Sequence, residues 1–439
     1  MQNVSLKYLE FENKVHQTLN KYYFTKHEKH YGIAVSGGPD SMLLLHVLSR
    51  WATLEDKFLS VFSFDHNLRE ESLNDVLFVE KTCRKLKCDF IKIRWSEKPT
   101  TGLMEKARVA RYSHIAKICL NKNIKTLFLG HHADDIAETV SMRIIHNSYI
   151  EGLCPIFELR EIFDIKFFRP LLCFTKDQLL NINIKQKINF INDPSNLSDK
   201  YFRSRIRKIL RKEEKLKYNL IKASLLFCKI RNFNEKFIKE KLKDYYIYRN
   251  EGFLEIKREI LKMYPKFMIL YFIRIAILRL GNKNYLSSAK VLEKMYCKAL
   301  LDKILTLSLG GCIIVFNKKK IFIYREYNDL VKSSQYLPSN TKKIWDNRFL
   351  IVNNTNQSIK VSPLGSCLDE AFYRKSFKKN KKKIKTLPLH VRKTLPVIFT
   401  LEGLAYIPHL NIYEINLLRD GTLSHTVDFF DKKYDNIVL

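Results

Sequence analysis

The sequence predicts an α/β parallel-sheet N-terminal domain, then a helical or mixed middle domain and a small α+β C-terminal domain. Strand-like and helix-like segments alternate over the first two hundred residues. The charge balance then changes: residues 1–210 hold 33 basic and 24 acidic side chains, and residues 211–439 hold 45 and 21. A chain of 439 residues also exceeds one average domain of roughly 100–200 residues. We expect domains over 1–211, 212–335 and 336–439.

Four short apolar runs in the first domain read as strands, and each is followed by a segment with helical spacing. The strands are expected at 31–35, 59–64, 90–93 and 126–130, and the helices at 41–51, 71–86, 103–119 and from about 133. Strands that alternate with helices favour a parallel sheet with right-handed crossovers. Ligands of such sheets lie at the carboxyl ends of the strands.

The second half has a different character. A charged helix is expected over 213–243, a more buried helix over 265–280, and strands between 305 and 325. The turn-like run 337–343 and the polar run 353–358 are candidate linkers. A final strand-rich unit is expected from about residue 360.

Composition excludes several classes of protein. With 46% hydrophobic residues and only 13 Gly and 11 Pro, the chain is not disordered or collagenous. The longest apolar stretch, 267–280, is too short to span a bilayer, and no targeting signal opens the chain. Nine cysteines without any CxxC pair support neither a disulfide framework nor a zinc ribbon. We therefore expect a cytoplasmic protein that does not enter membranes.

The net charge of +33 indicates a polyanionic partner. Nucleic acid is favoured over a membrane surface. Eight of the twelve residues in 374–385 are basic, which suits contacts with phosphates. A solvated lysine-rich loop is the alternative interpretation of that segment.

The strongest motif lies between the first strand and the first helix, at residues 36–41. Two consecutive glycines let the backbone approach a ligand closely, and the following helix N-terminus attracts anions. The lysine of a Walker A loop is absent, and an ordinary strand-to-helix turn is the alternative. The motif consists of Ser36, Gly37, Gly38, Pro39, Asp40 and Ser41.

Two more polar segments follow later strands. Residues 64–69, with Asp65, His66 and Arg69, end the second strand. Residues 130–139 open a helix with His131, Asp134, Asp135 and Glu138, and suit either a metal ion or an amino substrate. A solvated helix cap is the alternative interpretation of the three carboxylates.

Together these strings resemble a known family. The loop at 36–41 is similar to the PP-loop of the N-type ATP pyrophosphatases, which have an adenine nucleotide alpha hydrolase-like fold. The string at 130–139 resembles the GHHADDxxET box of the tRNA(Ile)-lysidine synthases. Residues 105–112, 169–172 and 193–207 resemble further motifs of that family, and 306–312 and 387–396 do so more weakly. Ser204 departs from the pattern, which usually has Asn at this place.

The resemblance implies a ligase that forms a carbon–nitrogen bond and converts ATP to AMP and pyrophosphate. The wobble cytidine of the CAU anticodon of tRNA(Ile) is adenylated, and the amine of free L-lysine then displaces AMP to leave lysidine. Codon specificity changes from AUG to AUA, and tRNA identity from Met to Ile. ATP and Mg²⁺ are the implied cosubstrate and cofactor, and a homodimer is left open.

The resemblance also implies roles for individual residues. The implied catalytic residues are Asp40, Arg111, Asp134, Asp135, Glu138 and Arg205. ATP binding falls to Ser36, Gly37, Gly38, Pro39, Asp40, Ser41, Asp65 and His66. Lysine binding falls to His131, Asp134, Asp135 and Glu138, and Mg²⁺ binding to Asp40 and Asp135. Contacts with tRNA fall to Arg203, Arg207, Lys378, Lys379, Lys382 and Arg392.

Three alternative functions stay open from the sequence. A PP-loop tRNA thiolase also adenylates a base, but such enzymes commonly use cysteine pairs that this chain lacks. An amide-forming PP-loop ligase for a small molecule would not need the basic second half. An RNA-binding protein with an inactive nucleotide site would not need Asp40, Asp65 and the three carboxylates.

Overall fold

The computed structural model divides the chain into two compact units, Met1–Arg231 and Asn232–Leu439. It describes residues 8–22, 26–65, 72–95, 103–192, 202–283, 286, 289–301, 304–331, 333–367, 381–400, 405–410, 412–413 and 427–429. The boundary between the units falls within the long helix α10 (Glu214–Lys241).

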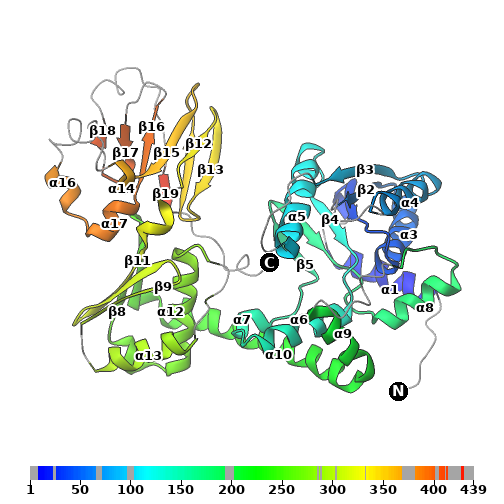
Figure 1. The fold of residues 1–439 in the computed structure, drawn as a ribbon, viewed down its shortest axis with the longest axis horizontal. Coiled ribbons are helices and arrows are strands. Elements are labelled where there is room, and N and C mark those ends of the chain that lie inside the picture. The colour runs from blue at the N-terminus through cyan, green and yellow to red at the C-terminus, as the bar shows by residue number, and fades with distance from the viewer. Residues whose placement is uncertain are drawn as a thin grey trace. The chain divides into compact units, whose positions relative to one another are not determined.

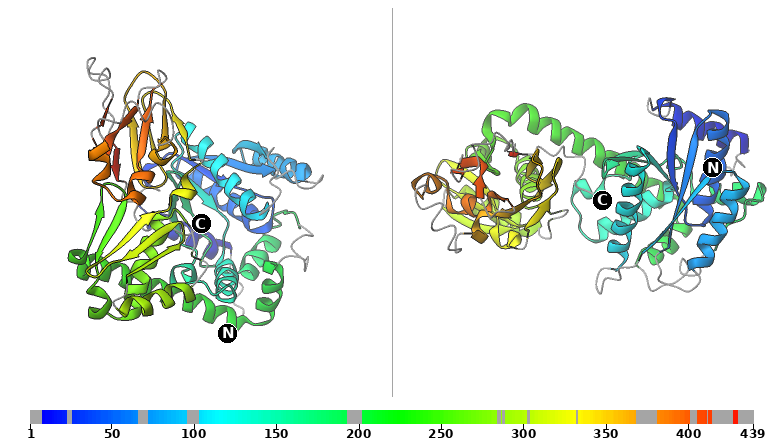
Figure 2. Two further views of the ribbon diagram at one scale, coloured as in Figure 1. Left: turned by 60° about the vertical axis from the view of Figure 1, so that its left-hand side comes forward. Right: turned by 90° about the horizontal axis from the view of Figure 1, so that it is seen from above.

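A six-stranded sheet organises the first unit. Figures 1 and 2 show this sheet among the helices of the unit. Its strand order is β3-β2-β1-β4-β6-β5, and every neighbouring pair is parallel except β5 and β6. The strands are β1 (His30–Ala34), β2 (Phe58–Asp65), β3 (Asp89–Arg94), β4 (Thr126–Leu129), β5 (Leu159–Ile162) and β6 (Ile165–Phe168). The predicted parallel-sheet α/β domain is confirmed.

Helices cover both faces of this sheet. The described helices of the first unit before α10 are α1 (Tyr8–Asn20), α3 (Pro39–Leu54), α4 (Ser72–Lys85), α5 (Leu103–Asn121), α6 (Ala133–Ile145), α7 (Ile150–Leu153), α8 (Lys176–Lys185) and α9 (Phe202–Lys212). Helices α1, α3 and α8 share one core cluster with the sheet, and α5 shares another. In β4 the alternation is direct: Phe128 belongs to the first cluster, and Leu127 and Leu129 belong to the second.

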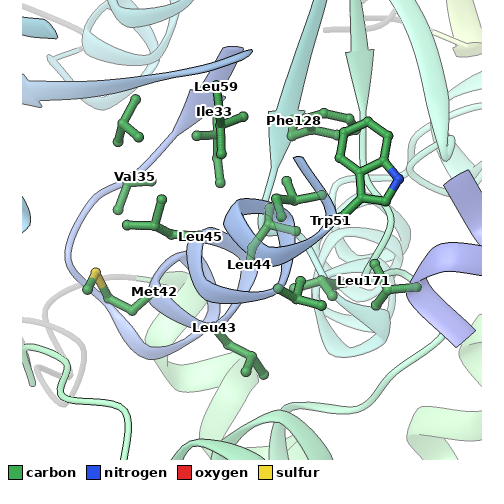
Figure 3. Close-up of a cluster of buried hydrophobic side chains, with 14 of the residues drawn as sticks. Ile33, Val35, Met42, Leu43, Leu44, Leu45, Trp51, Leu59, Phe128 and Leu171 are labelled. Carbon is green, nitrogen blue, oxygen red and sulfur yellow. The ribbon is translucent and has the colours of Figure 1, made fainter. Parts of the chain in front are cut away.

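The core beneath α3 fixes the start of that helix. Figure 3 shows Ile33 and Val35 facing Met42, Leu44 and the neighbouring side chains of α3. Those side chains are almost completely buried. The packing therefore positions the loop between β1 and α3 against a rigid support.

The strand order also locates the expected ligand site. From β1 the chain moves to β2 and β3 on one side, and β4 and β6 lie on the other. The sheet thus has its topological switch point between β1 and β4. Open α/β sheets bind ligands at the carboxyl ends of the strands at this point.

The second unit contains antiparallel sheets. One sheet has the order β7-β8-β11-β10-β9, and two others have the orders β12-β15-β16-β17-β18 and β13-β14-β19 (Figure 1). Its strands are β7 (Tyr246–Arg249), β8 (Phe253–Lys257), β9 (Leu305–Leu309), β10 (Cys312–Phe316), β11 (Lys320–Arg325), β12 (Gln335–Leu337), β13 (Thr341–Trp345), β14 (Phe349–Asn353), β15 (Ile359–Pro363), β16 (Pro396–Phe399), β17 (Ala405–Ile407), β18 (Ile412–Tyr413) and β19 (Val427–Phe429).

Two hydrophobic clusters stabilise this unit. The first packs α12 (Lys266–Leu280) and α13 (Ala289–Leu300) against the β7–β11 sheet, together with α11 (Ile260–Met263). The second joins the remaining sheets with α14 (Leu364–Cys367), α16 (Lys381–Lys385) and α17 (Leu389–Thr394). The division of these elements into domains 212–335 and 336–439 stays a prediction.

The expected linkers at 337–343 and 353–358 were wrong. The first run contains the end of β12 and the start of β13, and the second connects β14 to β15. The final group of strands, expected from about residue 360, therefore begins at Gln335. The reason is Asn353, which is fully buried. Its amide nitrogen donates to the carbonyl oxygens of Leu337, Pro338 and Gln357, and this holds both polar runs in ordered turns.

In the part of the chain that the structure describes, no helix is both long and apolar enough to cross a membrane.

Candidate functional site

The loop after β1 has the geometry of an anion site. Gly37 has a φ of +87°, a backbone conformation that is unfavourable for residues other than glycine. The hydroxyl of Ser41 accepts a hydrogen bond from the backbone N–H of Ser36 (3.3 Å) and donates to the carbonyl of Gly38 (3.0 Å). Gly38 caps α3 without any side-chain hydrogen bond to the first turn. The helix N-terminus is thus presented by backbone alone, which suits a phosphate.

Asp40 lies in the first turn of α3 and faces the end of β4. Its Oδ2 accepts a hydrogen bond from Nζ of Lys176, at 2.5 Å, and lies 3.7 Å from Nε2 of His132. Its Oδ1 is buried and accepts no hydrogen bond from any residue that the structure describes. An unpartnered carboxylate oxygen at a phosphate loop is a suitable ligand for a cation.

His132 joins the loop to the acidic helix α6. The imidazole is buried, and its Nε2 lies 3.6 Å from Oδ2 of Asp135 as well as 3.7 Å from Asp40. Its Nδ1 lies 3.7 Å from Oδ2 of Asp134. One ring therefore stands among three carboxylates that come from two helices.

Asp134 connects α6 to two other helices. Its Oδ2 accepts a hydrogen bond from the backbone N–H of Lys176 at the start of α8, at 2.8 Å. Its Oδ1 accepts one from Nζ of Lys217 in α10, at 2.5 Å. Lys217 is buried, although lysine is one of the residues least often found buried.

Asp135 caps its own helix. Its Oδ2 accepts a hydrogen bond from the backbone N–H of His132 (3.0 Å), and its Oδ1 accepts one from Arg203 (2.8 Å). Burial alone would raise the pKa of Asp135. The neighbouring His132, Arg203 and the backbone N–H outweigh burial and hold that pKa well below its usual range. Asp135 therefore stays ionised.

Glu138 is buried and accepts hydrogen bonds only from arginine side chains in the contacts that the structure describes. Arg203 Nε donates to its Oε2 (2.7 Å), and Arg207 Nε donates to its Oε1 (2.6 Å). These arginines are four positions apart on α9 and share one face. Arg205 lies on another face, where it is exposed and stacks over Phe202 at 5.6 Å. The structure thus brings Arg203 and Arg207, and not Arg205, to the acidic residues.

The acidic network is balanced by cations of the same chain. Four carboxylates, Asp40, Asp134, Asp135 and Glu138, meet four side-chain cations, Lys176, Lys217, Arg203 and Arg207. Such ion pairs need each other, because a buried charge left alone is costly by about 3–5 kcal/mol. A ligand that pairs with a cation of this network must displace its carboxylate partner, and a ligand that pairs with a carboxylate must displace its cation.

A basic cluster borders this network. Arg111 donates a hydrogen bond to the hydroxyl of Tyr112 (3.1 Å), and its guanidinium stacks on the same ring. Arg169 donates from Nε to Nδ1 of His131 (3.2 Å) and from Nη1 to the carbonyl of Phe157 (2.9 Å). Burial lowers the pKa of Arg169 to about 10. It remains a cation at neutral pH.

His131 is held neutral in this setting. Burial lowers the pKa of His131 well below its ordinary value; nearby Asp135 opposes that shift, and Arg169 adds to it. The neutral ring can accept the hydrogen bond of Arg169, which a protonated ring could not do.

Asp65 stands at the carboxyl end of β2, as expected. It is buried, and its Oδ1 accepts a hydrogen bond from the hydroxyl of Ser72 (2.7 Å). His66 lies outside the described residues, as do Lys378 and Lys379. Lys382 is exposed on α16, and Arg392 is half-buried on α17.

The second unit holds a basic pocket of about 480 Å³. One of its ten lining residues, Glu259, is acidic. Six are basic: Lys257, Arg258, Lys262, Lys318, Lys319 and Lys320. Arg258 organises it, because its guanidinium donates to the carbonyls of Asn317 and Ala299, both at 2.5 Å. The β10–β11 turn and the end of α13 are thereby joined around a cationic hollow.

The donor set fits Mg²⁺ only in part. Among the described residues, no three His, Cys, Asp or Glu side chains are grouped to hold a metal ion. The buried Oδ1 of Asp40 fits, because Mg²⁺ is commonly bound by one or two carboxylates, with substrate phosphates and water completing its shell. Both oxygens of Asp135 already accept hydrogen bonds.

Sequence reasoning missed Lys176 and Lys217. Lys176 follows Thr175, which caps α8 with a capping box. The sequence could therefore place Lys176 at a helix start but could not predict its contact with Asp40. Lys217 is one of many lysines in a charged helix, and no local signal marks it as buried. His132 was part of the recognised string but had no role assigned.

Known proteins match this chain over most of its length. Residues 8–214 match the model of the PP-loop domain. The chain is 27% identical to a tRNA(Ile)-lysidine synthase of Orientia tsutsugamushi, covering 90% of this chain and 91% of that one. It is 29% identical to the Rickettsia typhi tRNA(Ile)-lysidine synthase (93% and 94% covered) and 29% identical to that of Wolbachia pipientis wMel (78% and 84%). The resemblance seen in the sequence is confirmed over most of the chain.

We predict that Gly37→Ala destabilises the protein and that Gly38→Ala does not. Alanine at position 37 would have to adopt a left-handed backbone conformation, and its Cβ would lie 2.7 Å from Cδ1 of Ile191. A Cβ at Gly38 would lie 3.7 Å from the nearest atom. The left-handed conformation alone costs about 1–2 kcal/mol. Urea denaturation of both variants measures the difference. Equal stabilities would contradict the strained-loop geometry.

We predict that His131→Gln reduces the loss of stability on acidification. The folded pKa of His131 is lowered, so below its unfolded pKa of about 6.5 only the unfolded chain binds the proton. Stability therefore falls as pH drops below about 6.5, by at most about 1.4 kcal/mol per pH unit. Thermal midpoints at pH 7.5 and 5.5 test this. The exposed His27→Gln is the control, and an identical pH dependence of all three proteins would refute the prediction.

Proposed function

We propose that this chain, whose residues 8–214 are a PP-loop domain, is an ATP-dependent ligase that joins lysine to the wobble cytidine of a CAU-anticodon tRNA(Ile). The similarity to enzymes named tRNA(Ile)-lysidine synthase over about nine-tenths of the chain supports this proposal. The reaction would produce lysidine, AMP and pyrophosphate.

One observation carries the proposal. Asp40 of the phosphate loop lies 3.7 Å from His132, which also stands 3.6–3.7 Å from Asp134 and Asp135. A site for phosphates and a site for an ammonium group are therefore adjacent. Adenylation followed by attack of an amine needs these two sites side by side.

The first step would be attack of the cytidine carbonyl oxygen on the α-phosphate of ATP. The P–O bond to pyrophosphate breaks, and its electron pair leaves with pyrophosphate. The N-terminus of α3 and the hydroxyls of Ser36 and Ser41 would hold the departing phosphates. Asp65 would contact the nucleoside, and Arg111 would stabilise charge that develops on the phosphoryl group.

The second step would be attack of the lysine ε-amine on the activated ring carbon. The C–O bond to AMP breaks as the C–N bond forms, and the ammonium proton passes to a carboxylate. Asp134 and Asp135 are the candidates nearest His132. His131, which interacts with Asp135, would line the amine site. We assign Glu138 a positioning role, since both its oxygens hold arginines.

Binding of the substrates would exchange partners within the balanced network. Phosphates of ATP compete for Arg203, Arg207 and Lys176, and this would release carboxylates for lysine. Bound Mg²⁺ would be held by Asp40 and neutralise charge on the pyrophosphate. Asp135 would join it only after a change in its present hydrogen bonds.

The tRNA would be held mainly by the basic second unit. The pocket bordered by Lys318 and Lys319 has the charge and the built frame to bind backbone phosphates. Arg205, Lys382 and Arg392 would add contacts, as would Lys378 and Lys379 outside the described residues.

The decisive experiment is incorporation of labelled lysine into RNA. Purified chain, ATP, Mg²⁺, radiolabelled lysine and a CAU-anticodon tRNA(Ile) transcript are expected to give labelled tRNA, and tRNA(Met) is not. Asp40→Asn abolishes incorporation, and the exposed Asp56→Asn does not. Pyrophosphate release without labelled RNA would favour the thiolase alternative. No label and no pyrophosphate would favour an RNA-binding protein.

We further predict that Lys318→Gln with Lys319→Gln weakens tRNA binding about tenfold at moderate salt. Loss of two phosphate contacts also lowers the slope of log affinity against log salt by about two. Lys342→Gln with Lys343→Gln, two exposed lysines on β13, is the matched control. Equal losses in both double variants would show that only overall charge matters.

A further inference from the structure

Lys217 has an unusual environment for a lysine. Among the described residues it is the only lysine whose side chain is buried, at 8% relative exposure. Lys215, two positions earlier on α10, is exposed. Buried lysines are rare unless they are paired, and the partner here is Asp134, whose Oδ1 lies 2.5 Å from Nζ.

The two carboxylate oxygens of Asp134 accept hydrogen bonds from different partners. Oδ2 accepts the backbone N–H of Lys176 and so holds the beginning of α8. Oδ1 holds the Lys217 ammonium. The buried His132 lies beside Asp134, with its Nδ1 3.7 Å from Oδ2. The structure thus contains a primary ammonium group bound to the acidic site that lies next to the phosphate loop.

We propose that Lys217 is a built-in occupant of the subsite for the substrate ε-ammonium, and that free lysine binds by displacing it. This inference rests on the proposed function. A side-chain ammonium on a four-carbon stem is the same chemical group in Lys217 and in the substrate. In the absence of substrate, Lys217 neutralises Asp134, which would otherwise be a costly buried charge.

The consequence is a lowered affinity for free lysine. A subsite that is open only a fraction of the time lowers the apparent affinity by that fraction. An occupant tethered to the same chain competes at an effective concentration in the millimolar range. Removal of the Lys217 ammonium should therefore tighten lysine binding and leave ATP binding unchanged.

The test is calorimetric titration of the full chain with L-lysine in the presence of ATP and Mg²⁺. Lys217→Met is expected to bind lysine about tenfold more tightly than the wild type, as for a subsite closed nine-tenths of the time. Lys217→Arg keeps a competing cation and should stay within about twofold of the wild type. Lys215→Met is the matched control on the same helix. Thermal melting checks folding, and Lys217→Gln, whose amide can donate to Asp134, replaces the Met variant if that one melts early.

Unchanged or weaker lysine binding in folded Lys217→Met and Lys217→Gln would overturn the inference and make Lys217 a structural clamp of α10. That result is separable from failure of the proposed function. If the wild type labels tRNA with lysine but the variants bind lysine no better, only the inference fails. If neither wild type nor variants bind lysine or label tRNA, the proposed function fails as well.

Discussion

The site depends on a closed set of ion pairs around His132. Asp40, Asp134 and Asp135 lie within 3.7 Å of this one buried ring, and each is neutralised by a Lys or Arg side chain from α8, α9 or α10. These pairs fix helices that are distant in the sequence. They also require that a charged ligand replaces a partner and is not simply added, because unpaired charges in a buried site are costly.

The parallel sheet makes this network possible. β1 and β4 are neighbours at the switch point, so the loop that precedes α3 and the histidines that precede α6 emerge at the same edge. Gly130 follows β4 and lies against the start of α3. A Cβ added at Gly130 would lie 3.2 Å from the backbone nitrogen of Ser41. Close contact of the two loops places Asp40 beside His132.

The second unit has a basic pocket with a fixed frame. Its pocket is lined by lysines of the β8 end and the β10–β11 turn, and Arg258 fixes that turn through backbone carbonyls. The guanidinium of Arg258 is buried, and the two carbonyls to which it donates join the turn to the end of α13. The exposed lysines around it are then held where a polyanion can reach several of them at once.

The alternation of strands and helices in the first unit could be predicted from the amino-acid sequence, because apolar periodicity indicates which face of an element is buried. The sequence also identified Ser36–Ser41 and residues 130–139, since glycine conformation and helix-start chemistry are local properties. Which charged side chains form pairs depends on the folded structure. Arg203 and Arg207 reach Glu138 while Arg205 faces away, and Lys217 is buried against Asp134 although nothing nearby in the sequence marks it. Asn353 likewise holds an expected linker in an ordered connection through the distant carbonyls of Leu337 and Pro338 and the nearby carbonyl of Gln357. Ion pairs and buried hydrogen bonds join residues that the chain brings together only on folding, so local pattern cannot specify them.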